Sequence, residues 1–583
     1  MANEVTTTPA APAAQQAPRL RRVLGQWDLV LLFVVAIVNL NVVPTIAANG
    51  GVTVWLWILA LLLFFWPQGV AVIELSHRYP QEGGVYLWTK RIFGDFHGFL
   101  SGWCYWTNNI FYVPTVLLYF VGISVYVAGP RARGLADNHL FALGTCIGLL
   151  ILLVILNVLG LGVGKWVNNL GGIGTLITAT TLIGLGILVI SRFGPTMNAA
   201  DFRIPGDLRL FGSFGVICFG LVGLELASIM GDEIQDPRRT LPGAVAWGGL
   251  ICGLLFIGAT LALLLGVNRG EIGVLQGVVQ AVSHMAEQVH VPWIISPFAF
   301  VLSISIAGIA SAWLAGSARI PFVAGLDLYL PEGLGKLHKK FATPYVALIV
   351  HASFSAIFLS MSFVGAGVKE AFVTMLDLAV VLQLVPYLYM HAALLKLASQ
   401  SAPGEGYYRK STLLLAGSCG LITTTLGIGV AFIPSHQIES IRLFEFKMVA
   451  GTLFFIGLAV FFFFFYRNRS PYKWGYVYGG LFICSALALL GLGLLAPLNG
   501  ASLSFYSFGL LFQAFLYGIT GVAILKKMKM AIILVWTMAI LGGVGMVLRQ
   551  FVLLDVASWF ISLTFAILFS RMRLALTDDL HRA

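Results

Sequence analysis

The sequence predicts an all-α membrane protein that crosses the bilayer many times, and two observations carry this prediction. Of its 583 residues, 59% are hydrophobic and only 10% are charged, and the mean hydropathy is +0.92. Soluble proteins contain about 45–50% apolar and about 25% charged residues, so a soluble globular enzyme and a disordered chain are both excluded. The apolar residues also form continuous runs, such as LLLFFW at 61–66 and FFFFFY at 461–466. A transmembrane β-barrel would instead show alternating segments of about ten residues.

A membrane-spanning helix needs about 20 apolar residues, and the sequence contains about sixteen such segments by this measure. They lie at about 27–48, 52–75, 97–128, 139–159, 168–191, 211–230, 242–266, 292–318, 343–364, 371–396, 412–434, 446–466, 477–497, 504–525, 530–548 and 551–570. We predict the following domains: a disordered tail (1–22), a core of two halves (23–400, divided at about 23–191 and 211–400), helices 11 and 12 (401–475), a four-helix membrane extension (476–572) and a second tail (573–583).

The net charge of +11 is explained by membrane orientation. If both termini are cytoplasmic, most of the 35 Lys and Arg residues fall in loops on the cytoplasmic side. Cytoplasmic loops of membrane proteins carry such an excess of Lys and Arg. We therefore predict a multi-pass protein of the cell membrane, in contact with the lipid bilayer, with both termini inside and no nucleic-acid partner.

Two of the apolar segments contain residues that oppose a continuous helix. Segment 1 carries Asn39, Asn41 and Pro44, and proline removes a backbone donor from a helix. Segment 6 is rich in glycine up to Gly223, which stands beside the carboxylate of Glu225. Glycine weakens a helix by about 0.5–1 kcal/mol relative to alanine, so an unwound stretch is expected here. The alternative for segment 6 is close helix packing through small residues.

The two breaks are five segments apart, which places the two interrupted helices in opposite orientations. This spacing is expected for two inverted five-helix repeats, and broken helices at corresponding positions indicate a transporter's midplane binding site. Amides at the N-terminus of a half-helix can hold a carboxylate, and freed carbonyl groups can accept an ammonium. A zwitterionic amino acid would suit this pair of helix ends.

Three stretches resemble the amino acid–polyamine–organocation (APC) superfamily. GLELASIMGDEIQDPRRTLP at 223–242 is similar to its G-x-E…P-x-R-x-(I/V/L)-P signature, ELSHRYPQEGGVYLW at 74–88 to its Y-P-x-x-G-G-x-Y pattern, and SARIPFVAGLDLYLPEGLGKLHKKFATPYVAL at 317–348 to its loop after helix 8. The three occur in the family's order. Residues 432–469 are faintly similar to the end of the glutamate/GABA antiporter branch.

The resemblance implies ten core helices in two inverted repeats, the APC/LeuT-type fold, followed by two further helices. It places the substrate between helices 1, 3, 6, 8 and 10. It also gives Phe219 the position of an aromatic gate and Glu225 a role in gating or proton sensing. The residues expected to bind substrate are Asn39, Asn41, Val43, Pro44, Thr45, Asn108, Tyr112, Phe219, Gly220 and Gly223.

The sequence departs from the family in helices 1 and 5. The glycine-rich motif of helix 1 is replaced by Asn39 to Pro44, so asparagine side chains take the place of some glycine amides. The lysine of proton-coupled members is absent from helix 5, where counting reaches about Thr175. Either a sodium ion lies near Thr175 with Ser303 or Ser305, or the protein exchanges solutes without that site. Ser and Thr in membrane helices commonly bond to their own helix instead.

Other polar residues of the apolar segments give weaker predictions. Asp377 in segment 10 would suit a cationic substrate or a proton, or be solvated at the membrane edge, and Gln383 and Tyr387 are further pocket candidates. The six cysteines have no paired spacing, and no phosphate-binding G-x-x-x-x-G-K-(S/T) motif occurs. We therefore expect no cofactor, no metal site and no enzymatic activity.

The function predicted is secondary active transport of amino acids by alternating access, as an exchanger or with proton or sodium coupling. One alternative is a polyamine, organic-cation or potassium transporter on the same fold. Another is a non-transporting membrane sensor that signals through the four extra helices. An oligomer is compatible with each of these.

Overall fold

The computed structural model describes residues 22–203, 213–267, 277–362, 368–400, 406–432 and 441–467, and these residues are almost entirely helical. No β-strand occurs among them, and one isolated bridge joins Leu24 to Ile234. The all-α prediction is therefore confirmed for this part of the chain. The four predicted segments of 476–572 and the tail 573–583 lie outside the described residues, as does the N-terminal tail up to residue 21.

The helices of the first half are α1 (Gln26–Ile37), α2 (Val42–Ala47), α3 (Val52–Ala60), the π-helical turn η1 (Leu61–Phe65), α4 (Trp66–Arg78), α5 (Val85–Phe93), α6 (Asp95–Ser124), α7 (His139–Val158) and α8 (Leu161–Phe193). Those that follow are α9 (Ser213–Gly220), α10 (Leu226–Ile229), α11 (Pro237–Gly266), α12 (Gly277–Gln288), α13 (Ile295–Ser317), α14 (Arg319–Leu326), α15 (Tyr345–Ser362), α16 (Val368–Gln400), α17 (Lys410–Ala431) and α18 (Ile441–Arg467). Short 3₁₀ turns are η2 (Pro130–Asp137), η3 (Ala199–Phe202), η5 (Gly231–Glu233), η7 (Pro292–Ile294) and η8 (Glu332–Gly335).

Seven helical runs of the described residues are long and apolar enough to cross a membrane. They include Val52–Arg78, in which α3, η1 and α4 form one run of 27 residues, and Pro292–Leu326, with 35 residues. Shorter apolar helices lie within α1, α15 and α18. Large apolar side chains such as Ile187 and Leu254 are more than 60% exposed on the outer surface. An apolar outer surface of this kind is expected to face the hydrocarbon of a bilayer rather than water. The chain therefore crosses a bilayer several times.

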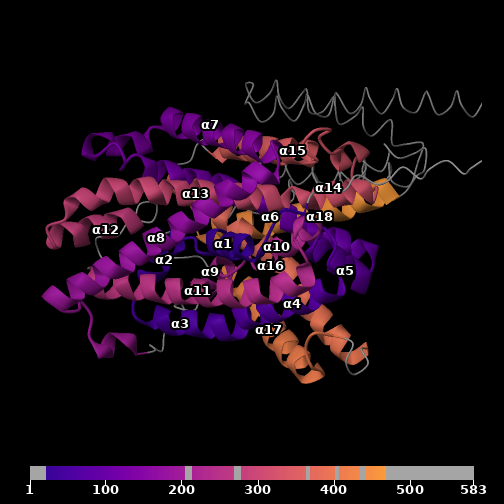
Figure 1. The fold of residues 1–583 in the computed structure, drawn as a ribbon, viewed down its shortest axis with the longest axis horizontal. Coiled ribbons are helices and arrows are strands. Elements are labelled where there is room, and N and C mark those ends of the chain that lie inside the picture. Colours follow the sequence, from indigo (N-terminus) through magenta and orange to yellow (C-terminus); the bar gives the residue numbers. More distant parts are fainter. Residues whose placement is uncertain are drawn as a thin grey trace, which may run out of the picture.

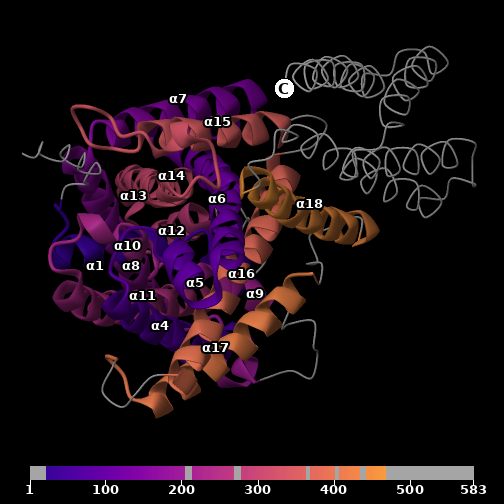
Figure 2. The same cartoon turned by 90° about the vertical axis from the view of Figure 1, so that its right-hand side faces the viewer.

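The long helices run side by side along one axis of the molecule (Figure 1). α12 lies near one end of this bundle and α5 near the other, and neither was predicted from the sequence as a separate helix. α7 packs against α15 on one edge, and α17 lies on the opposite edge (Figure 2). In the centre, α6 contacts α13 and α16, while α8 contacts α1, α11 and α13.

Small residues allow α1, α8 and α13 to approach closely. A Cβ atom added to Gly171 of α8 would lie 2.7 Å from the Cα of Gly308 on α13 and 2.9 Å from Cγ2 of Val35 on α1. Helix association in membranes depends on such small residues, because apolar area alone gives no preference for protein over lipid. The same contact brings Thr175 of α8 close to Ser305 of α13.

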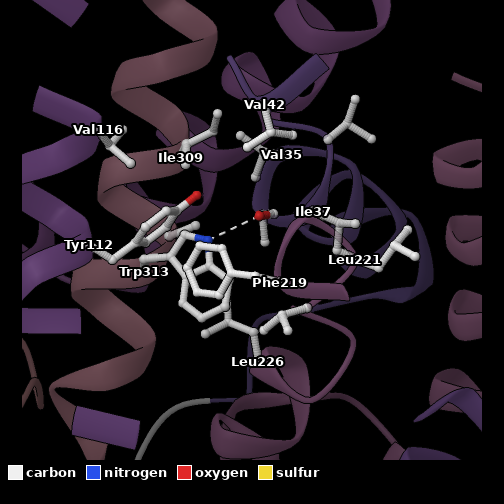
Figure 3. Packing of buried hydrophobic residues seen from close by; sticks show 14 of the residues in the cluster. Val35, Ile37, Val42, Tyr112, Val116, Phe219, Leu221, Leu226, Ile309 and Trp313 are labelled. Carbon is white, nitrogen blue, oxygen red and sulfur yellow. Dashed lines mark hydrogen bonds between the residues drawn. The ribbon is translucent and has the colours of Figure 1, made fainter. Parts of the chain in front are cut away.

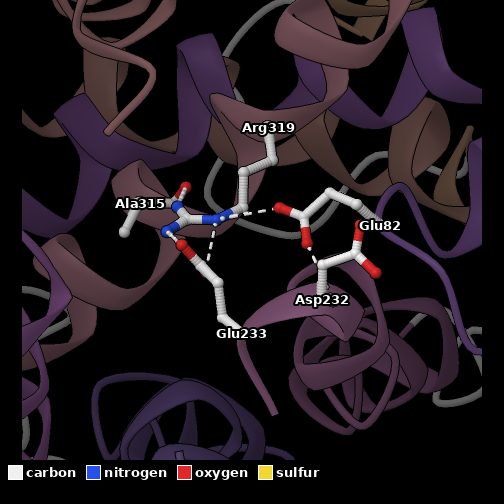
Figure 4. A network of polar contacts seen from close by, with 5 residues as sticks. All are labelled: Glu82, Asp232, Glu233, Ala315 and Arg319. Carbon is white, nitrogen blue, oxygen red and sulfur yellow. Dashed lines mark hydrogen bonds and ion pairs between the residues drawn. The ribbon is translucent and has the colours of Figure 1, made fainter. Parts of the chain in front are cut away.

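A buried charged cluster links the turn before α5 to η5 and to the start of α14 (Figure 4). The Arg319 guanidinium donates from Nε and Nη2 to the two carboxylate oxygens of Glu233, at 2.9 Å each. Its Nε lies 3.3 Å from Oε1 of Glu82, whose Oε2 accepts the backbone N–H of Asp232 at 3.2 Å. All three charged side chains of the cluster, Glu82, Glu233 and Arg319, are at most 7% exposed.

This cluster joins the three stretches that resemble the superfamily motifs. Glu82 belongs to the turn after α4, Glu233 to η5 after the second break, and Arg319 to the start of α14. The neighbouring Gly84 has a φ of +42°, and a Cβ atom there would lie 2.9 Å from the backbone nitrogen of Ile229. The glycine of the Y-P-x-x-G-G pattern is thus required by the close contact between this turn and α10.

The cluster contains two carboxylates for one guanidinium, and this imbalance affects Glu82. Burial, and then the neighbouring Glu233, raise the pKa of Glu82 well above its ordinary value, against the opposing effect of Arg319. A protonated Glu82 leaves a neutral Arg319–Glu233 pair. When pH rises through the raised pKa of Glu82, a second buried negative charge appears and the stabilisation from its protonated form is lost.

We therefore expect the protein to become less stable as pH rises above the ordinary pKa of a glutamate, about 4.3, by up to about 1.4 kcal/mol per unit of pH until the raised pKa of Glu82 is passed. Glu82→Gln should flatten this dependence, because the amide has no proton to lose. The measurement is the unfolding temperature of the purified protein against pH. The exposed Glu332→Gln is the control, and an unchanged pH profile in Glu82→Gln would contradict the assignment.

Candidate functional site

The helical run of the first apolar segment stops at Ile37 and resumes at Val42. Between them, the side-chain oxygen of Asn39 accepts the backbone N–H of Asn41 at 3.4 Å, which offers the backbone an alternative to the helical bond. Pro44 is the third residue of α2. The first N–H groups of a helix have no partner within it, so proline is tolerated there. Asn39 thus helps to end one helix, and Pro44 is accommodated near the start of the next.

The second interruption lies between Gly220, where α9 ends, and Leu226, where α10 begins. Gly223 has a φ of +138°, a conformation that residues with a Cβ atom rarely adopt. A Cβ atom on Gly223 would also lie 2.8 Å from Cγ1 of Ile37. The second break therefore packs directly against the end of α1, and the two breaks form one site.

A small cavity lies where the two breaks meet. Its volume is about 10 Å³, which is about the space of one water molecule. Five of the predicted binding residues line it, and its lining residues carry no formal charge. The lining consists of Ala36, Ile37, Asn39, Val42, Asn108, Tyr112, Phe219, Gly220, Val222 and Trp313.

Three aromatic rings close this cavity (Figure 3). The ring centroid of Tyr112 on α6 lies 5.4 Å from that of Phe219 on α9 and 5.5 Å from that of Trp313 on α13, both edge to face. The Tyr112 hydroxyl accepts Nδ2 of Asn39 at 2.8 Å. Trp313 donates from Nε1 to the carbonyl oxygen of Ala36 at 3.0 Å, so it satisfies a backbone group at the end of α1.

The other predicted binding residues do not line the cavity. Asn41, Val43 and Pro44 are buried beside it. Gly223 lies in the second break and packs against Ile37. Thr45 belongs to α2, but its side chain lies outside the described part of the structure. The side chain of Asp377, on α16, does so too.

Glu225 is fully buried next to the second break and accepts hydrogen bonds from five neutral donors. Oε1 accepts the Tyr105 hydroxyl at 3.0 Å and Nε2 of Gln383 at 3.4 Å. Oε2 accepts Nε2 of Gln68 at 3.1 Å, the backbone N–H of Gly223 at 3.0 Å and the Tyr387 hydroxyl. These partners come from α4, α6, α16 and the break itself, so one carboxyl group connects four parts of the bundle.

A chain of hydrogen bonds leads from the cavity to this carboxyl group. Asn108, which lines the cavity, donates from Nδ2 to Oε1 of Gln383, and Gln383 donates in turn to Glu225. The amide oxygen of Asn108, Oδ1, is buried without a hydrogen-bond partner among the described residues. A buried acceptor without a partner is costly, so a donor group of a ligand would be favoured at this oxygen.

The predicted ion-site residues form a separate polar contact. The hydroxyl oxygens of Thr175 and Ser305 are 2.6 Å apart, and Thr175 also donates to the carbonyl of Gly171 on its own helix. Ser303 donates to the carbonyl of Ala299 at 2.7 Å. The structure thus brings two of the three residues together and leaves Ser303 bonded within α13. No group of three or more His, Cys, Asp and Glu side chains arranged for a metal occurs in the ranges that the structure describes.

The sequence analysis missed Gln68, Tyr105 and Trp313. Gln68 and Trp313 stand in largely apolar stretches, and Tyr105 lies among other aromatic and polar residues of α6, so none of them gives a periodic pattern. Gln68 and Tyr105 are 0% exposed, and a buried polar side chain in a membrane helix is expected to face the bundle interior. That rule was the only signal that could have found them.

Several curated transporters are similar to this chain. An uncharacterized transporter of Legionella pneumophila is 28% identical over 450 residues, which are 75% of this chain and 95% of the relative. The branched-chain amino acid permease BcaP of Bacillus subtilis is 26% identical, over 62% of this chain and 81% of the relative. The probable agmatine/putrescine antiporter AguD of Lactococcus lactis is 23% identical, over 50% and 62% respectively.

Among solved structures, MhsT in complex with L-phenylalanine matches with a TM-score of 0.53 over 70% of this chain and 99% of that chain, at 13% identity. This likeness shows a shared fold. The sequence model of the amino acid permease family matches residues 24–455, a range that covers both breaks, the cavity and the charged cluster. The chain therefore belongs to the amino acid permease family, within the APC superfamily that its three motifs predicted.

Proposed function

We propose that this protein is a secondary active transporter that moves a neutral amino acid across the cell membrane by alternating access. The observation that carries the proposal is the uncharged cavity at the meeting point of two interrupted helices, closed by Tyr112, Phe219 and Trp313. Irregular backbone at membrane depth is tolerated only within protein or next to a water-filled cavity, and in transporters it is used to bind solutes.

The lining of the cavity favours an amino acid with an apolar or aromatic side chain. The side chains of Ile37, Val42 and Val222 are aliphatic, and three more side chains of the lining are aromatic. The two asparagines supply its polar side chains besides the Tyr112 hydroxyl and the Trp313 indole. The substrate ammonium would bind the unpaired Oδ1 of Asn108 and carbonyl groups at the first break. The branched-chain permease of B. subtilis and the phenylalanine complex of MhsT support this class of substrate.

Transport requires the site to open, because about 10 Å³ cannot hold an amino acid. The tight contacts of Gly223 with Ile37, and of Tyr112 with Phe219, would separate first. We propose that α1 and α10 move together relative to α6 and α13, within two inverted repeats of about 23–191 and 211–400. Both termini would be cytoplasmic, and the four membrane helices of the 476–572 extension stay a prediction.

Two residues, Glu225 and Thr175, bear on how transport would be coupled to a second solute or ion. Glu225 would transmit occupancy of the cavity, through Asn108 and Gln383, to α4 and α16. Helix α8 has Thr175 in place of a fixed ammonium, and its hydroxyl is already bonded to Ser305. This favours exchange of one amino acid for another over coupling to an ion at that place.

A second candidate is a polyamine or organic-cation transporter, which the similarity to the agmatine/putrescine antiporter favours. A cation with two ammonium groups needs a carboxylate that is accessible from the cavity. Glu225 is fully buried, and neutral donors surround it. The neutral amino acid therefore fits the observed site better.

The first test is uptake into proteoliposomes of labelled leucine, phenylalanine, arginine and putrescine. We expect uptake of leucine or phenylalanine into vesicles loaded with unlabelled amino acid, and little uptake into empty vesicles. Uptake into empty vesicles that a proton or sodium gradient drives would overturn the exchange mode. Uptake of putrescine alone would overturn the substrate class.

Glu225→Gln should lower the initial rate of uptake at least tenfold. The amide places an N–H group among donors that now face two carboxylate oxygens, so at least one buried donor loses its acceptor, at a cost of about 1–3 kcal/mol. Tyr105→Phe removes one donor and keeps the carboxylate, so a loss of about fivefold is expected. Equal rates in Glu225→Gln and wild type, at matched protein in the vesicles, would show that this group has no part in transport.

Trp313→Phe should weaken substrate binding about fivefold, because it leaves the Ala36 carbonyl without its indole partner at the end of α1. Binding is measured as the half-saturating concentration in the uptake assay. Trp106→Phe is the matched control, since its buried Nε1 has no hydrogen-bond partner among the described residues. If both variants shift binding equally, the effect comes from ring size and the role assigned to the Trp313–Ala36 bond is wrong.

A further inference from the structure

A second, larger cavity lies on the outer face of the bundle, between the run η1–α4 and α11. Its volume is about 430 Å³, within the range of ligand pockets. Its walls include Leu61, Val70 and Ile73 on one side and Val245 and Ile257 on the other. Leu250 and Leu254 also line it and are 54% and 62% exposed, so this groove opens to the surface that faces lipid.

The groove has the length of one leaflet. Its wall on α11 extends from Val245 to Ile257, which is about 18 Å at the rise of an α-helix. Half of the hydrocarbon core of a bilayer is about 15 Å thick. The groove begins about two helical turns after the start of α11 at Pro237 and ends about two thirds of the way along that helix. Its length is therefore close to that of one acyl chain in a leaflet.

Small residues create the space on the α11 side. A Cβ atom on Gly249 would lie 3.3 Å from Cε1 of Phe65, and one on Gly253 would lie 3.4 Å from Cδ2 of Leu61. Ala246 is a third small residue of the lining, and it is exposed. A side chain larger than alanine at any of these positions would fill the groove.

Basic residues gather at the end of the groove near Val245. Arg238 and Arg239, both exposed, precede Val245 by about two helical turns. On the other side, Tyr408 lines the groove and donates its backbone N–H to Oε2 of Glu74 at 2.9 Å, and the other oxygen of Glu74 binds Arg78 at 2.6 Å. The two residues that follow Tyr408 are the exposed Arg409 and Lys410.

Among the residues that the structure describes, these basic residues exceed the nearby acidic groups. Asp236 lies 3.6 Å from Arg239 and Glu74 binds Arg78, which leaves the charges of Arg238, Arg409 and Lys410 in excess. A lipid headgroup lies about 5–8 Å beyond the hydrocarbon boundary, at the level of these side chains. Basic residues at this depth attract anionic lipids.

We propose that the groove between η1–α4 and α11 binds one acyl chain of an anionic phospholipid, with the phosphate held by Arg238 and Arg409. The lipid fills a cavity that water cannot occupy favourably, because its lining is apolar and opens to hydrocarbon. It also covers Leu224, which stands next to Glu225 and lines the groove from the second break. The lipid would thus lie against the segment that forms the second break.

The test is native mass spectrometry of the detergent-solubilised full chain, titrated with dioleoylphosphatidylglycerol or with dioleoylphosphatidylcholine. We expect one phosphatidylglycerol to bind at least tenfold more tightly than phosphatidylcholine. The double variant Arg238→Gln/Arg409→Gln should lose about fivefold in affinity per arginine removed. Ala246→Trp, which fills the groove, should abolish the tightly bound lipid.

Matched controls separate this site from general effects of charge and size. Lys336→Gln/Lys339→Gln removes two exposed basic residues at another loop, and Gly148→Trp adds a ring to the exposed face of α7, where a new side chain meets open space. Both should bind the lipid as the wild type does. Equal affinity for the two lipids, or retention of the lipid by Ala246→Trp, would overturn the proposal.

Discussion

Interrupted backbone at membrane depth must be satisfied by protein groups, because hydrocarbon offers neither donors nor acceptors. Three buried contacts meet this requirement in the described structure. The Trp313 indole binds the Ala36 carbonyl at the end of α1, Glu225 accepts the N–H of Gly223, and Asn39 accepts that of Asn41. The helices that surround the site therefore contribute hydrogen-bonding groups to the breaks as well as apolar surface.

The cavity lies at the second break, and the charged cluster lies beyond α10, which follows that break. α10 has only four residues, and it separates Glu225 from Glu233 along the chain. Glu225 is bonded to α4, α6 and α16, whereas Glu233 is bonded to Arg319 at the start of α14. A displacement of α10 that opens the cavity would also pull on the ion pair. Since a buried ion pair is costly to break, the cluster favours the closed position of α10.

The sequence identified residues that line one cavity of the structure, but several contacts around that cavity could not be predicted from it. The breaks are marked by residues that oppose helix continuation, namely Pro44, Gly223 and the asparagines. One cavity is lined by Asn39, Asn108, Tyr112, Phe219 and Gly220.

The sequence could not identify Trp313 and Tyr105 in this way, since an aromatic residue in an apolar helix has the same pattern whether it faces lipid or a carbonyl group. The pairing of Thr175 with Ser305 depends on the approach of α8 and α13 at Gly171 and Gly308, which a single sequence does not reveal. The charged cluster was missed because its members come from three distant stretches.

The position of Glu225 also determines what kind of role it can have. It does not line the cavity, and no cationic side chain is among its hydrogen-bond partners in the described residues. In the proposed mechanism, a substrate ammonium would therefore meet Asn108 first. If that amide turned to bind the substrate, its donor bond to Gln383 would change, and Gln383 is also a donor to Glu225. Tyr387 lies four residues after Gln383 on α16 and donates to the same carboxyl group. Under the proposed function, Glu225 would thus report occupancy of the cavity to α4 and α16 rather than bind the substrate.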